Sequence, residues 1–93
     1  MEQIDNQDKK VTYAPQRSYA SRNLTRFPSF NELSQYVSLS FANNPITSLE
    51  TLPSLPSLKV INLSGTDIES FYGAQVQPSL EKLYIKNTLS IYL

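Results

Sequence analysis

An apolar pattern recurs every 22 residues in this chain, and that repeat constrains the fold more than any other feature of the sequence. Two full turns carry it at Tyr36, Leu39, Phe41, Ile46, Leu49, Leu52 and Leu55, then at Leu58, Ile61, Leu63, Ile68, Phe71 and Ala74. The same frame continues one turn earlier from Ala14 and one turn later from Leu80. Its polar exceptions are Arg17, Gln77 and Ser90. Because such short units bury their apolar sides only against their neighbours, the sequence predicts a solenoid.

Two apolar positions in each repeat flank one intervening residue, which is the alternation of a short strand. Three such pairs are expected on stacked parallel strands with their side chains inside the solenoid: Leu39/Phe41, Ile61/Leu63 and Leu83/Ile85. The stretch after Leu49 has apolar groups at every third position and contains Pro53 and Pro56. That spacing favours 3₁₀ turns or irregular segments on the convex side over full α-helices.

The ninth position of each repeat is expected to hold the turn that follows the strand. Its occupants are Arg22, Asn44, Thr66 and Thr88. An asparagine amide can satisfy several backbone groups there, whereas a threonine hydroxyl makes fewer hydrogen bonds. Only Asn44 therefore fits fully. Arg22 breaks the series unless Asn23 replaces it through a one-residue shift, so the first turn is the least regular.

The motif L-x-x-L-x-L-x-x-N-x-L resembles the leucine-rich repeat. Residues 44–49 and 58–64 are similar to the intracellular class typified by the repeat regulatory subunit of protein phosphatase 1. The resemblance covers residues 15–93, about three and a half repeats. It implies an α/β-type solenoid with short parallel strands on a concave face that binds a protein partner. Serine and alanine occupy concave positions where that family carries acidic and aromatic residues.

Composition argues against catalysis. The chain has no histidine and no cysteine, which removes the usual general base, the thiol nucleophile and most transition-metal ligands. Its two glycines, Gly65 and Gly73, are too few for a phosphate-binding loop. We therefore predict no enzymatic activity, no cofactor and no metal.

Eight acidic and eight basic residues give a net charge of zero, so no strong field favours nucleic acid or an anionic membrane. Residues 1–14 are expected to form a flexible polar tail ahead of a repeat domain at 15–93. The first residues lack the apolar core of a signal peptide, which predicts a cytoplasmic protein.

The C-terminal residues 89–93 carry four large apolar groups at what the pattern predicts to be an open edge. Solenoids usually end in a polar capping repeat. We therefore expect the C-terminal cap to be missing, either because the chain is a piece of a longer repeat protein or because a partner or a second copy covers the edge.

The outward residues of the strands and of the turns after them are the candidate partner-binding surface. They are Ser38, Ser40, Asn43, Val60, Asn62, Lys82, Tyr84 and Lys86. Most are small and uncharged and would equally tolerate solvent. Lys82, Tyr84 and Lys86 differ from the others, because an aromatic group between two lysines resembles an interface anchor with a polar rim. The same trio could stack on single-stranded nucleic acid, although three residues are a weak signal.

Three functional readings follow from the sequence. The first is a non-catalytic module that binds a protein or peptide on its concave face. The second is a regulatory subunit of an enzyme such as protein phosphatase 1. The third is a scaffold segment of a longer repeat protein with no separate activity.

Overall fold

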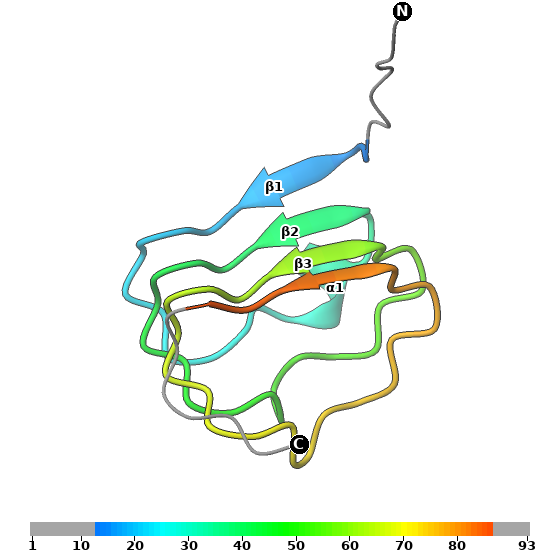
Figure 1. Ribbon diagram of the computed structural model, residues 1–93. Helices are drawn as coiled ribbons and strands as arrows, with labels where there is room; N and C mark the ends of the chain where they lie inside the picture. The colour runs from blue at the N-terminus through cyan, green and yellow to red at the C-terminus, as the bar shows by residue number, and fades with distance from the viewer. Residues whose placement is uncertain (1–12, 87–93) are drawn as a thin grey trace, which may run out of the picture.

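The strands of this protein stack one per repeat. The computed structural model describes residues 13–86 (Figure 1). Its strands form one parallel sheet in the order β1-β2-β3-β4. The elements are β1 (Gln16–Ser18), α1 (Phe30–Leu33), β2 (Ser38–Ser40), β3 (Val60–Asn62) and β4 (Lys82–Tyr84). Figure 1 shows the strands side by side, with the connecting segments returning on one side of the sheet. The described residues include no helix that could cross a membrane and no cluster of metal-ligating side chains.

The strand register repeats the sequence period. Leu39 of β2 pairs with Arg17 of β1 on one side and with Ile61 of β3 on the other. The backbone ladder also continues past the strand ends, since the Phe41 N–H donates to the Asn62 carbonyl over 2.8 Å. The predicted parallel strands are confirmed, because consecutive repeats place equivalent residues opposite each other.

The apolar core lies between the sheet and the returning segments. Leu39, Phe41, Ile61 and Leu63 are buried as the alternation predicted. The returning segments of the second and third repeats are irregular, with isolated i to i+3 hydrogen bonds such as Leu52 N–H to the Leu49 carbonyl at 3.1 Å. In the first repeat the short helix α1 takes this place, which the sequence pattern did not indicate.

Asn44 joins the first two turns. It is only 2% exposed. Its Nδ2 donates to the carbonyls of Tyr19 and Phe41, both over 2.9 Å. Its Oδ1 accepts from the backbone N–H groups of Arg22 at 2.9 Å and Leu24 at 3.0 Å. One carboxamide therefore satisfies backbone groups of two successive repeats.

This geometry corrects the expectation for the first turn. Neither Arg22 nor Asn23 contributes a buried side chain, because both are exposed. The asparagine of the following repeat bonds the turn's backbone instead. Thr66 makes one bond of this kind, from its hydroxyl to the Leu63 carbonyl at 2.8 Å, as the smaller side chain predicted. Thr88 lies outside the described residues.

Gln77 is a polar residue at an apolar position of the repeat, and Leu83 is an apolar residue that is less buried than expected. Gln77 is half-buried and bonds the previous repeat, accepting from the Leu55 N–H at 2.9 Å and donating to the Pro53 carbonyl at 2.8 Å. Leu83 was expected inside the solenoid but is 41% exposed. It lines an apolar hollow of about 360 Å³ together with Leu63 and other core residues.

The predicted features at residues 1–12 and 87–93, including the apolar C-terminal run, lie outside the described part of the chain.

Replacing Asn44 should destabilise the protein strongly. We expect Asn44→Ala to lower the free energy of unfolding by about 2–4 kcal/mol, because several buried backbone groups lose their partner. Thr66→Ala, which removes one such bond, should cost about 1 kcal/mol. Urea denaturation followed by circular dichroism measures both. Equal losses in the two variants would contradict the bridging role of Asn44.

The two leucines of neighbouring repeats provide a second test. Leu63→Ala should cost on the order of 2–5 kcal/mol, because Leu63 is 2% exposed and its removal leaves a cavity. Leu83→Ala should cost only about 1 kcal/mol, since much of that side chain already meets solvent. The same denaturation experiment compares them. A larger loss for Leu83→Ala would show that its environment in solution is more buried than in this structure.

Candidate binding surface

The surface that we call the sheet face is formed by the outward residues of the four strands: Gln16, Ser18, Ser38, Ser40, Val60, Asn62, Lys82 and Tyr84. Register places Ser38, Val60 and Lys82 side by side across the sheet. Ser40, Asn62 and Tyr84 are side by side in the same way, and the outward residues of each strand with the turn after it are called a row. Six of the eight predicted binding residues therefore lie on three adjacent strands. The other two, Asn43 and Lys86, lie in the turns after β2 and β4.

The middle of the sheet face has small side chains that already bond their own turns. The Ser40 hydroxyl accepts from the Ala42 N–H at 3.4 Å, and Asn62 Oδ1 accepts from the Ser64 N–H at 2.9 Å. A hollow of about 330 Å³ lies over β1 and β2, and its lining residues are Gln16, Arg17, Ser18, Ser38 and Ser40. This region supplies space, a few polar atoms and one charged group, the guanidinium of Arg17.

Asn43 has a backbone role in addition to its place on the predicted surface. Its φ of 60° is left-handed, and the equivalent positions Ser21 and Gly65 have φ of 57° and 74°. The turn after each of these strands therefore needs a residue that tolerates this conformation, which explains an asparagine and a glycine there. A Cβ at Gly65 would also overlap the Asn43 side chain. The sequence reading missed this requirement, although the aligned Asn43, Gly65 and Asn87 were its signal.

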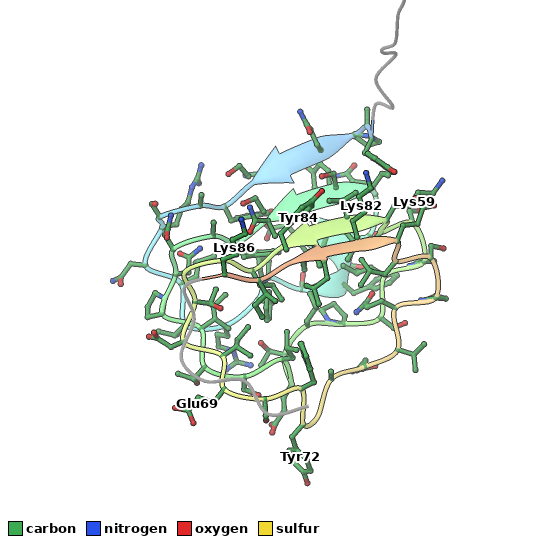
Figure 2. All side chains as sticks on the ribbon, viewed as in Figure 1. Lys59, Glu69, Tyr72, Lys82, Tyr84 and Lys86 are labelled. Carbon is green, nitrogen blue, oxygen red and sulfur yellow. The ribbon has the colours of Figure 1, made fainter. Side chains whose placement is uncertain are left out.

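The last row carries the exposed aromatic and basic groups. Tyr84 is 48% exposed. Figure 2 shows Lys82, Tyr84 and Lys86 along β4 and the turn after it, with Lys59 near the start of β3. Glu69 and Tyr72 lie on the far side of the molecule, among the returning segments (Figure 2). The structure therefore brings the predicted Lys82, Tyr84 and Lys86 together on one edge of the sheet face.

Tyr13 reaches this edge from the other end of the sheet. It precedes β1, yet its hydroxyl donates to Oε1 of Glu81 over 3.2 Å, 68 residues further along the chain. Its ring centroid lies 5.2 Å from the Lys82 Nζ, within the range of a cation–π contact. Nothing in the repeat pattern indicated this contact, because Tyr13 lies before the first repeat position. The contact joins two segments that are far apart in the sequence.

The N-terminal edge is covered by a group of aromatic and charged side chains. Tyr19 stacks on Phe41 with ring centroids 5.1 Å apart, and its hydroxyl donates to Oε2 of Glu32 over 2.6 Å. The Arg17 guanidinium lies 4.8 Å from the Tyr19 ring centroid and donates to the Tyr36 hydroxyl over 3.5 Å. Burial and the Glu32 carboxylate raise the pKa of Tyr19 from 10.0 to about 12. The polar exception Arg17 thus covers an aromatic side chain that would otherwise meet solvent.

Comparison with known families agrees with this geometry. Residues 34–73, which include β2 and β3, match the family model described as leucine-rich repeats in two copies. This part of the chain is therefore similar to a pair of leucine-rich repeats. Such repeats generally mediate protein–protein interactions and are typically non-catalytic. No curated protein and no solved structure matches the chain.

The raised pKa of Tyr19 predicts a specific pH dependence. The folded protein holds the phenolic proton more tightly than the unfolded chain, so this stabilisation is complete below pH 10 and is lost as the pH rises towards 12. The difference in unfolding free energy between the wild type and Tyr19→Phe should therefore be constant below pH 10 and shrink above it. Urea denaturation across this pH range measures the difference. Parallel curves would contradict the hydrogen-bonded environment of Tyr19.

Proposed function

We propose that this protein is a non-catalytic module that binds a protein or peptide partner on its sheet face. The observation that carries the proposal is the row formed by Lys82, Tyr84 and Lys86, because it places a half-exposed tyrosine between two bases. Tyrosines of this kind often anchor interfaces, since they bury a large apolar area and keep a hydrogen-bonding group.

The neighbouring strands support this proposal through their small side chains. Ser38, Ser40 and Asn62 protrude little from the sheet, so a partner backbone can approach closely beside Tyr84. The Ser and Asn side chains also offer further hydrogen-bonding atoms to such a partner. The sheet face thus combines an anchor at one end with an open, polar approach from the other.

A regulatory role towards an enzyme, such as protein phosphatase 1, would use the same surface. The identity of the partner distinguishes this narrower role from that of a general adaptor. A third role is that of a scaffold segment. It applies if a tagged chain purified from its cells brings down only a longer product of the same gene.

Two tyrosines on opposite sides of the molecule allow a matched test. Tyr84→Ala changes the sheet face, whereas Tyr72→Ala changes the far side at a residue that is 83% exposed. A tagged chain is recovered from the cells that produce it, and co-purifying proteins are quantified by mass spectrometry. Recovery of a stoichiometric partner should fall at least about ten-fold with Tyr84→Ala, as expected for an anchor worth about 1.4 kcal/mol or more, and should be unchanged with Tyr72→Ala.

Denaturation midpoints show whether each variant remains folded. Lys82→Glu provides a second change on the sheet face, and it leaves the apolar core unchanged because Lys82 is exposed. Full partner recovery with both Tyr84→Ala and Lys82→Glu would refute binding at this surface. Loss of the partner with Tyr72→Ala alone would move the interface to the far side of the molecule.

A further inference from the structure

We infer that the partner segment on the sheet face is an acidic peptide that contains an aromatic residue. The inference rests on the proposed function and specifies the chemistry of its ligand. Two independent observations carry it: the distribution of charge along the sheet face, and the contact that Lys82 already makes with an aromatic ring.

Charge on the sheet face has one sign. None of its eight positions is acidic, and Lys82 is joined at the same edge by Lys59 and Lys86 (Figure 2). All three lysines are exposed. The nearby carboxylate of Glu81 accepts the hydrogen bond from the Tyr13 hydroxyl. Although the net charge of the chain is zero, this edge presents three ammonium groups that would attract carboxylates locally.

Tyr13 shows which second group fits beside these lysines. Its ring lies against Lys82 while its hydroxyl reaches Glu81, so an aromatic side chain already occupies this part of the edge. Tyr13 comes from the segment before β1 and not from the repeat itself. A partner aromatic residue could replace it by making the same cation–π contact, while flanking carboxylates approach Lys59 and Lys86.

A peptide explains the surface better than a nucleic acid does. Single-stranded nucleic acid is held by several stacking aromatic residues along a basic groove. Here Tyr84 is the exposed aromatic group on β4, and Tyr13 is half-buried with its ring against Lys82. The outward residues of β2 and β3 include no cation. The small polar side chains of β2 and β3 suit a narrow peptide backbone, and the lysines near β4 suit a few carboxylates.

The direct test uses the whole chain and a defined probe. A fluorescein-labelled peptide of alternating glutamate and serine with one central phenylalanine is titrated with the protein and followed by anisotropy. Two control peptides replace every glutamate by glutamine or the phenylalanine by alanine. We expect both controls to bind more weakly, and the affinity for the acidic peptide to fall as the salt concentration rises.

Charge variants then locate the site. Lys82→Glu and Lys86→Glu should each weaken binding about three- to ten-fold, whereas Arg26→Glu, with the same change of charge at an exposed residue between β1 and α1, should leave it unchanged. Tyr13→Ala should strengthen binding about two- to five-fold, because the peptide aromatic no longer competes for Lys82. Denaturation midpoints identify any effect that comes from lost stability.

Several results would overturn the inference. Equal affinity for the glutamine peptide would remove the role of carboxylates, and tighter binding of an oligothymidylate probe would reassign the edge to nucleic acid. Equal weakening by Lys82→Glu and Arg26→Glu would indicate attraction to overall charge and no defined site. If Tyr84→Ala abolishes recovery of the native partner while the acidic peptide does not bind, the proposed function stands and only the chemistry assigned here fails.

Discussion

The carboxamide of Asn44 is the interaction on which the regular stacking of the first repeats depends. Each strand ends in a sharp turn whose backbone groups are removed from water by the next repeat, and buried groups of this kind are costly unless they are hydrogen-bonded. Asn44 satisfies groups on both sides of the boundary, from Tyr19 in the first turn to Phe41 in its own. Thr66 does less at the equivalent place. The boundary between the first and second repeats therefore has more of these side-chain hydrogen bonds than the next boundary.

The two edges of the sheet are protected differently. At β1, Arg17 and Tyr19 cover the core, and Glu32 accepts a hydrogen bond from the Tyr19 hydroxyl. At β4, Leu83 remains partly exposed beside an apolar hollow. The proposed binding row lies at the less covered edge.

The proposed recognition depends on a few side chains. Residues in the middle of the sheet face are partly committed to their own turns, as Ser40 and Asn62 are. Lys82 and Tyr84 lie on β4 and carry the longer side chains. The contact of Tyr13 with Lys82 adds a group from outside the repeats to this edge. The proposed binding residues are thus separate from the residues that maintain the stack.

The sequence alone determined the repeat length, the parallel strands and the buried pairs such as Ile61 and Leu63, because each follows from a local period. It also indicated the special role of Asn44, because that role follows from the hydrogen-bonding capacity of one side chain. It also placed Lys82 and Tyr84 on one outward row. Only the tertiary structure decided that Asn44 holds the turn around Arg22, that Leu83 is partly exposed, and that Tyr13 reaches Glu81. The two contacts join segments that are far apart in the sequence, and the exposure of Leu83 depends on what packs against it, so a local periodic pattern does not encode these features.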